Sequence, residues 1–70
     1  MRIPRIFTAQ PLITGSSIQL EEGAARHLSS ALRMSVGQNI ILFDGRGGEY
    51  SAALTEVKKG KVWVAVNEFS

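Results

Sequence analysis

The amino-acid stretch that decides the fold runs from residue 39 to residue 69 and reads NIILFDGRGGEYSAALTEVKKGKVWVAVNEF. Residues 39–43 form a continuous apolar run, which predicts a strand that is buried on both faces. Residues 49–57 and 61–69 are rich in β-forming side chains, and valines alternate with other residues in the second segment. Each boundary between these runs contains glycine. The stretch therefore predicts three consecutive strands joined by hairpin turns.

The first of these turns, Asp44-Gly45-Arg46-Gly47-Gly48, has two interpretations. Its glycines suggest a phosphate-binding loop, but the Gly-Lys-Ser/Thr ending of a P-loop is missing and the segment does not open a helix. Asp-Gly is a strong signal for a hairpin turn, so we favour the hairpin, with Arg46 at its tip still able to touch a ligand. The second turn, Lys58-Lys59-Gly60, is predicted to join the last two strands.

The beginning of the chain supplies two more strand segments. Residues 3–7 place apolar side chains around Pro4, which fits an edge strand or an extended arm because proline cannot donate to an interior ladder. Residues 14–17, Thr-Gly-Ser-Ser, are typical of a turn. Ile18 and Leu20 then alternate with polar neighbours, as in a short strand.

One helix is predicted between residues 21 and 34. Glu21 and Glu22 lie in its first turn, where the positive end of the helix macrodipole favours acidic side chains. Gly37 is expected to end the segment. The apolar positions recur at helical spacing and are expected to face the core; they are Ala24, Leu28, Ala31 and Leu32.

Together these elements predict a mainly β fold, a small β-barrel of about five or six strands with one inserted α-helix, because small all-β chains hide their edges by closing. Residues 1–70 are expected to form a single domain, which at this length buries only about 60% of its unfolded surface. Phe69-Ser70 follow directly after a strand, so we expect the chain to be a piece of a longer protein, cut at a domain boundary.

Composition narrows the class of protein. Cysteine is absent from the 70 residues, which excludes disulfides and is compatible with a reducing cytoplasm. No apolar run approaches the roughly 18 residues of a membrane helix, and no signal-peptide core follows the first arginines. We therefore expect a cytoplasmic protein with no membrane partner. The net charge of +2 is too small to indicate nucleic-acid binding by itself.

Residues suited to catalysis are sparse. The one histidine, His27, has no evident acid–base partner and is more typical of a helix-surface or partly buried polar side chain than of a ligand contact. No serine lies in a nucleophile elbow or a Ser-x-x-Lys arrangement. A single histidine with scattered carboxylates does not form a metal site. We expect no catalytic, cofactor-binding or metal-binding residue in this chain.

The candidate binding residues are the arginines, whose planar guanidinium groups suit bidentate phosphate contacts. On the predicted helix, Arg26 and Arg33 stand at i and i+7 and would project from one side. If the barrel brings the arm, the helix and the loop together, the five arginines form one patch. The alternative is a solvated surface on which each arginine is paired with a nearby carboxylate. The five are Arg2, Arg5, Arg26, Arg33 and Arg46.

The remaining cations and aromatic residues are assigned structural roles. Lys58, Lys59 and Lys61 are expected to keep an exposed hairpin soluble. Phe43 and Trp63 are expected in the core rather than as platforms for base stacking, because each lies in a strand with apolar alternation. The functional prediction therefore depends on the arginines.

Several motifs occur in an order that resembles a known family. They are Met1-Arg2-Ile3-Pro4-Arg5-Ile6-Phe7, then Arg26-His27-Leu28, then Ala31-Leu32-Arg33-Met34 and Gly37, then Leu42-Phe43-Asp44-Gly45, then Gly48-Glu49-Tyr50. This combination resembles the N-terminal domain of the RsmE family, bacterial methyltransferases that modify N3 of a uridine in small-subunit ribosomal RNA. Ala31 departs from the expected larger aliphatic residue, a change that we expect to affect packing only.

The resemblance implies a PUA-like β-barrel that helps to hold 16S ribosomal RNA of the small ribosomal subunit. It also implies a C-terminal SPOUT-type methyltransferase domain, absent from these residues, that binds S-adenosylmethionine and forms a homodimer. Contact with RNA is implied for the five arginines, foremost Arg2, Arg5 and Arg33.

Three functions remain open on the sequence. The first is an RNA-positioning domain of an S-adenosylmethionine-dependent methyltransferase. The second is a structural or protein-interaction β-barrel that orients the catalytic domain, with its arginines paired internally. The third is a free-standing small RNA-binding protein, which a reading frame ending at Ser70 would support.

Overall fold

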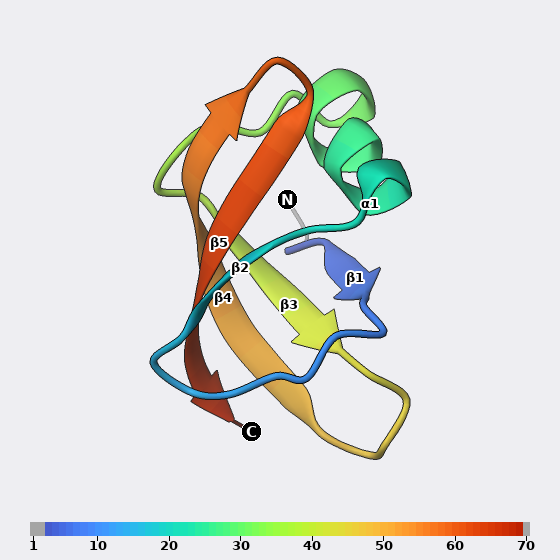
Figure 1. Cartoon of the computed structure of the whole chain (residues 1–70), viewed down its shortest axis with the longest axis vertical. Helices are drawn as coiled ribbons and strands as arrows, with labels where there is room; N and C mark the ends of the chain where they lie inside the picture. The colour runs from blue at the N-terminus through green and yellow to red at the C-terminus, as the bar shows by residue number, and fades with distance from the viewer. Residues whose placement is uncertain (1–2, 70) are drawn as a thin grey trace.

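The computed structural model describes residues 3–69 and folds them into one curled, mixed five-stranded sheet with a helical segment beside it (Figure 1). The helical segment, α1 (Glu22–Arg26) followed by the π-helical turn η1 (His27–Ala31), lies between the second and third strands. The predicted mainly β, PUA-like fold with one inserted helix is confirmed. The strands, in the sheet order β1-β3-β4-β5-β2, are β1 (Arg5–Phe7), β3 (Asn39–Phe43), β4 (Glu49–Lys58), β5 (Lys61–Phe69) and β2 (Ser17–Gln19).

Both predicted hairpins are present. β4 and β5 pair antiparallel up to Lys58 and Lys61, and the two residues between them, Lys59 and Gly60, have φ of +52° and +77°. Two successive positive φ angles are what a two-residue type I′ turn needs, and this turn matches the right-handed twist of the strands. β3 and β4 are joined by residues 44–48, where the backbone N–H of Arg46 donates to Asp44 Oδ1 at 2.9 Å.

The first strand lies at a sheet edge, as the proline predicted. β1 pairs only with β3, in parallel, and the N–H of Ile41 donates to the carbonyl of Pro4 at 2.9 Å. At the other edge, β2 pairs antiparallel with β5, so that Ile18 lies beside Val64. Among residues 3–69, no backbone ladder joins β1 to β2.

A side-chain seam closes the barrel where that ladder is missing. The buried Thr8 hydroxyl donates to the Glu21 carboxylate, with Oε2 at 2.8 Å, and the Ala9 N–H donates to the same oxygen at 3.0 Å. Gln10 Nε2 donates to the carbonyl of Gln19 at 2.7 Å. Partial burial raises the pKa of Glu21, but these and backbone hydrogen bonds outweigh burial and hold the pKa below its usual value. The ionised carboxylate thus ties the segment after β1 to the segment after β2.

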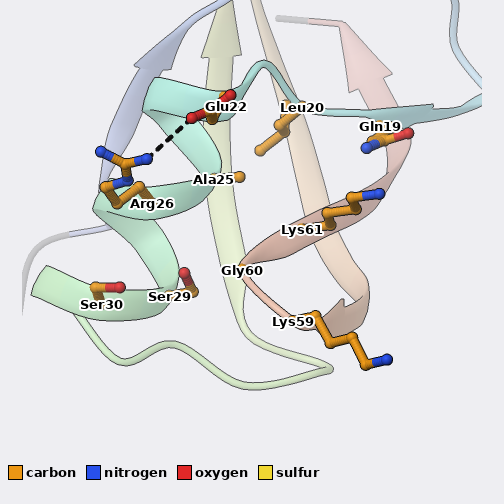
Figure 2. A pocket seen from close by; sticks show the side chains of 10 residues that line it. All are labelled: Gln19, Leu20, Glu22, Ala25, Arg26, Ser29, Ser30, Lys59, Gly60 and Lys61. Atoms are coloured by element: carbon orange, nitrogen blue, oxygen red, sulfur yellow. Dashed lines mark hydrogen bonds and ion pairs between the residues drawn. The ribbon is translucent and has the colours of Figure 1, made fainter.

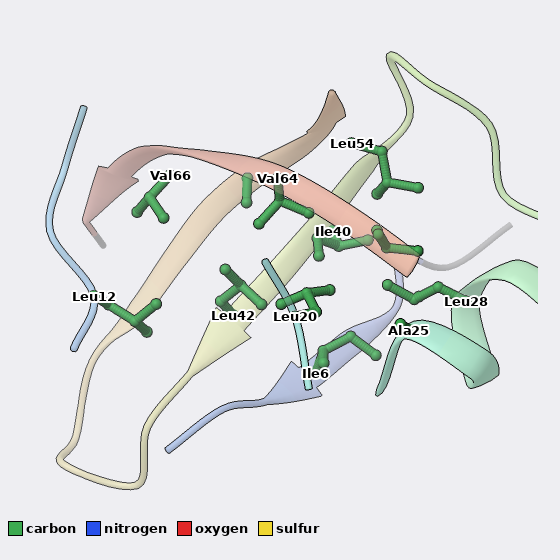
Figure 3. Packing of buried hydrophobic residues seen from close by; sticks show 12 residues of the cluster. Ile6, Leu12, Leu20, Ala25, Leu28, Ile40, Leu42, Leu54, Val64 and Val66 are labelled. Carbon is green, nitrogen blue, oxygen red and sulfur yellow. The ribbon is translucent and has the colours of Figure 1, made fainter. Parts of the chain in front are cut away.

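The core fills the inside of the curled sheet, where side chains from the strands and the helical segment meet (Figure 3). In β3, Ile40 and Leu42 are fully buried, whereas Ile41 and Phe43 are half-exposed. The prediction of a strand buried on both faces is therefore wrong. The reason is that the outer face of the sheet has no second layer against it within residues 3–69, so only alternate side chains reach the core.

The helical segment is shorter than predicted and buries a different face. It ends at Ala31, because Leu32 N–H bonds back five residues to the His27 carbonyl in a π-type turn. The wider turn rotates later positions out of phase, so Ala31 and Leu32 are exposed, against the prediction. Ala25 and Leu28 are the buried residues.

The segment ends before the predicted Gly37. The residue in the left-handed conformation is Arg33, with φ of +51°, and Met34 N–H then donates to the Leu28 carbonyl at 2.9 Å. A left-handed residue commonly follows the end of a helix, and glycine usually occupies this position. No helix in residues 3–69 is long and apolar enough to cross a membrane.

Candidate functional site

The structure describes four of the five candidate arginines and does not bring them into one patch. Arg2 lies outside the described residues. Arg5, on β1, forms an ion pair with Glu49, and its guanidinium carbon lies 5.4 Å from the centre of the Phe43 ring. Arg5 is therefore held on the outer face of the sheet by a carboxylate and an aromatic ring.

The two helix arginines do not share one helical face. Arg26 is the last residue of α1, and its Nη2 lies 2.9 Å from Glu22 Oε1. Arg33 comes after the end of the helical segment in a left-handed conformation, so the i, i+7 relation predicted for a continuous helix does not hold.

Arg46 lies far from both. It belongs to the loop between β3 and β4, which Figure 1 shows at the lower end of the molecule, whereas α1 lies near the upper end. The long dimension of the fold is 29 Å. The prediction of one arginine patch is therefore wrong for Arg26 and Arg46, because the strands that separate them in sequence span the barrel.

What the structure does assemble is a groove between the helical segment and the β4–β5 turn (Figure 2). We call it the basic groove; its volume is about 330 Å³. Arg26 lies on the helical side, and Lys59 and Lys61 lie on the strand side. Leu20 and Ala25 form apolar parts of its lining. Two segments far apart in sequence thus place three cations around one depression.

The lining of the groove has the same net charge as the whole chain. Its lining contains three cations and one carboxylate, Glu22, which is a net charge of +2. The whole chain, with eight cations and six carboxylates, also has a net charge of +2, and the other described residues of 3–69 contribute four cations and five carboxylates. A concave surface with charge of one sign concentrates the field that attracts an anion.

A buried hydroxyl adds a polar group to the groove. Ser29 lines it, and its Oγ has no solvent exposure and no hydrogen-bond partner among the described residues. Figure 2 shows Ser29 on the helical segment, between Arg26 and the β4–β5 turn. A buried hydroxyl without a partner is unfavourable unless a ligand or water bonds it.

The ion pair at the groove does not block it. The side chains of Arg26 and Glu22 are 72% and 85% exposed, so their pairing contributes little free energy in water. A phosphate can therefore replace the Glu22 carboxylate as the partner of Arg26 at small cost. The groove is suited to hold one or two phosphates of a polyanion by charge and hydrogen bonds.

Sequence reasoning missed the lysines of this site. Lys59 and Lys61 were assigned to the solubility of the hairpin, but the β4–β5 turn lies next to the helical segment. The local signal was present, because a Lys-Gly type I′ turn fixes the direction of Lys59. The packing of β5 against α1 places Lys59 across the groove from Arg26, and residue spacing in the sequence does not show this packing.

The other singled-out residues take no part in the groove. Phe43 and Trp63 are half-buried on the outer face rather than in the core. His27 is exposed on η1. Within residues 3–69, no three His, Cys, Asp or Glu residues are grouped as a metal site would need.

A curled five-stranded sheet with one helical segment inserted after β2 is the arrangement of a PUA-like β-barrel. The sequence profile of the family described as RNA methyltransferase PUA domain matches residues 20–67, more than half of the chain. The chain belongs to this family.

Solved structures agree with this assignment. The chain is similar to a Legionella pneumophila protein, described as a methyltransferase and solved with the bound cofactor SAM, at 30% identity and a TM-score of 0.96. It is similar to ribosomal RNA small subunit methyltransferase E from Neisseria gonorrhoeae, bound to S-adenosyl methionine, at 30% identity and a TM-score of 0.91. These matches cover 100% and 99% of this chain but 29% of each relative, so the chain spans under a third of their length.

A third solved structure is similar to this chain in fold alone. A Porphyromonas gingivalis protein, described as an rRNA methyltransferase, shares 24% identity and a TM-score of 0.82. It covers 97% of this chain and 27% of that protein. The barrel is therefore conserved in shape at an identity where side chains have largely changed.

Proposed function

We propose that this chain is the RNA-binding domain of a larger S-adenosylmethionine-dependent methyltransferase, and that it positions ribosomal RNA for a catalytic domain outside these 70 residues. The observation that carries the proposal is the basic groove, where Arg26, Lys59 and Lys61 with Glu22 give the lining of one depression in an RNA methyltransferase PUA domain a net charge of +2. Phosphate contacts of this kind set the register of a protein on RNA without reading its sequence.

The finer assignment follows the similarity to the Neisseria gonorrhoeae enzyme. We propose that the substrate is 16S ribosomal RNA of the small subunit, that N3 of a uridine receives the methyl group, and that the protein works in the cytoplasm as a homodimer formed through its catalytic domain. Residues 1–70 form a single RNA-binding unit in this proposal. Of the arginines predicted from sequence, Arg26 has the support of the groove, and Arg2, Arg5, Arg33 and Arg46 stay predictions.

S-adenosylmethionine is assigned to the rest of the protein. The glycines of residues 45–48 lie in a hairpin between two antiparallel strands, not in a turn that opens a helix. They do not fit a cofactor-binding loop of the kind that presents helix N–H groups to a ligand. No residue of this chain is therefore given a part in the methyl transfer.

The test is the salt dependence of RNA binding by the full-length protein. Log affinity falls as log salt rises, and each phosphate contact that is lost makes this negative slope shallower by about 0.7 to 0.9. We expect this loss for Lys59→Ala, for Lys61→Ala and for Arg26→Ala. The matched control is Lys58→Ala, which removes a lysine of the same hairpin that does not line the groove. Slopes that stay equal to the parent in all three groove variants would refute the proposal.

A structural or protein-interaction barrel is the competing function, and the ion pairs of Arg5 with Glu49 and of Arg26 with Glu22 favour it. Glu22→Gln separates the two functions. In an RNA-binding groove it frees Arg26 and removes a like charge from the phosphates, so RNA binding tightens. In a structural barrel it leaves RNA binding unchanged.

A further inference from the structure

A second hollow lies at the end of the molecule away from α1. The β3–β4 loop, the chain at Pro11 and Leu12, and the end of β5 surround a volume of about 390 Å³. Figure 1 shows the β3–β4 loop and the C-terminal end of β5 together at the lower end of the fold. We call this the distal hollow. It is distinct from the basic groove and shares no lining residue with it.

Two aromatic rings line the distal hollow. Phe69 and Tyr50 pack edge to face, with ring centres 4.9 Å apart and an angle of 60° between their planes. Gly48 lies directly against the Phe69 ring, and a Cβ at this position would collide with the ring. The ring is therefore held on the backbone of the β3–β4 loop. Phe69 is nevertheless 63% exposed among the described residues and lines the hollow, so a ligand in the hollow can contact it.

The charges at the distal hollow are balanced and include an available guanidinium group. Among the described residues, Asp44 and Arg46 are the charged ones that line it, and Asp44 Oδ1 accepts a hydrogen bond from the backbone N–H of Arg46. Within residues 3–69, no carboxylate forms an ion pair with the Arg46 side chain. The guanidinium group can therefore donate to a ligand oxygen, which complements the negative charge of a nucleotide.

The two depressions have opposite chemistry. Counting the lining residues within 3–69, the basic groove has a net charge of +2 and no aromatic side chain, whereas the distal hollow has two aromatic rings and no net charge. Phosphates are held by cations, but unpaired bases are held by stacking on aromatic rings, with hydrogen bonds to their edges. The distal hollow therefore suits a base rather than a length of phosphate backbone.

We propose that the distal hollow binds an unstacked nucleobase of single-stranded RNA, with Phe69 as the stacking surface and Arg46 donating to the base edge or the adjacent phosphate. The proposal rests on the proposed function in one respect, since it takes RNA to be the ligand of this domain. It adds a base-binding site at the far end from the groove, so that the domain contacts RNA at both ends of its long axis.

The test compares two probes on the full-length protein, an oligouridylate and an abasic oligoribonucleotide of the same length. Phe69→Leu keeps an apolar side chain over Gly48 but removes the π face. It is expected to weaken oligouridylate binding by about 5-fold to about 150-fold, the range typical of one lost stacking contact. Binding of the abasic probe should not change. Phe69→Tyr, which keeps the ring, should bind like the parent.

Two further measurements separate failure of this site from failure of the groove or of folding. Phe69→Leu should leave the salt slope unchanged, whereas Lys59→Ala should make it shallower. The salt slope therefore reports on the basic groove, and the affinity for oligouridylate reports on the distal hollow. Arg46→Gln, on an exposed loop, supplies a variant without an altered core and should also weaken oligouridylate binding. Equal oligouridylate affinity of Phe69→Leu and the parent would overturn the proposal and assign the exposed ring to a protein contact instead.

Discussion

The side-chain seam that closes the barrel makes a quantitative prediction about Thr8 and Glu21. Thr8 is fully buried and its hydroxyl lies 2.8 Å and 3.0 Å from the two carboxylate oxygens of Glu21. A hydrogen bond to a charged group contributes about 1.5 to 3 kcal/mol. Glu21 is exposed, so water competes for the carboxylate and we expect a coupling free energy of about 1 kcal/mol.

The assay is a double-mutant cycle of Thr8→Val and Glu21→Gln, followed by thermal unfolding with far-UV circular dichroism. A loss of about 1 kcal/mol in a domain of this size lowers Tm by about 4 to 8 °C. The single variants should each lower Tm, and the double variant should lower it by less than their sum. Glu22→Gln is the matched control, because it removes a neighbouring charge whose ion pair is exposed.

The coupling free energy between Thr8 and Glu21 should decrease as the pH falls. The folded pKa of Glu21 lies below its usual value of 4.5, so its stabilising contribution is complete above that value. It is lost as the pH falls from about 4.5 through the folded pKa, because the protonated carboxyl no longer accepts these hydrogen bonds as an anion. The stability of Glu21→Gln should therefore fall less steeply over this acidic range. A coupling energy equal at neutral and acidic pH would refute the reasoning.

The core and the end of the helical segment make two more predictions. Leu28→Ala should lower the free energy of unfolding by about 2 to 5 kcal/mol, measured by urea denaturation, because Leu28 is fully buried. Leu32→Ala, at a side chain that is 44% exposed, should change it by no more than about 0.5 kcal/mol, and equal effects would contradict the π-turn geometry. Arg33→Gly should raise the free energy of unfolding by about 1 kcal/mol, because glycine adopts a φ of +51° without strain. A lower Tm for Arg33→Gly would show that its left-handed conformation is not the native one.

The strands and turns could be predicted from the sequence because their signals are local. Pro4 excludes an interior position for the first strand, and Asp44-Gly45 and Lys59-Gly60 specify turns through the φ angles that they allow. The length of the helical segment was predicted less well. The apolar spacing continues to Leu32, but a π-type turn changes the phase after Leu28, and apolar spacing alone does not show such a turn.

The candidate site was harder to predict than the fold. The arginines stood out by composition, yet the structure pairs Arg5 with Glu49 and separates Arg26 from Arg46 by the length of the barrel. The cations that line one groove with Arg26 are Lys59 and Lys61. In the sequence these two lysines are typical of a solvent-exposed hairpin.

The sequence alone determined the class of the fold, the strand and turn positions and the family, because these depend on residue order over short distances. The tertiary structure decided which charges share a surface, and which aromatic rings stay exposed. The curling of the sheet brings the β4–β5 turn beside α1 and seats Phe69 on the β3–β4 loop. Contacts between residues so far apart in the chain depend on how the sheet twists and closes, which no local pattern encodes.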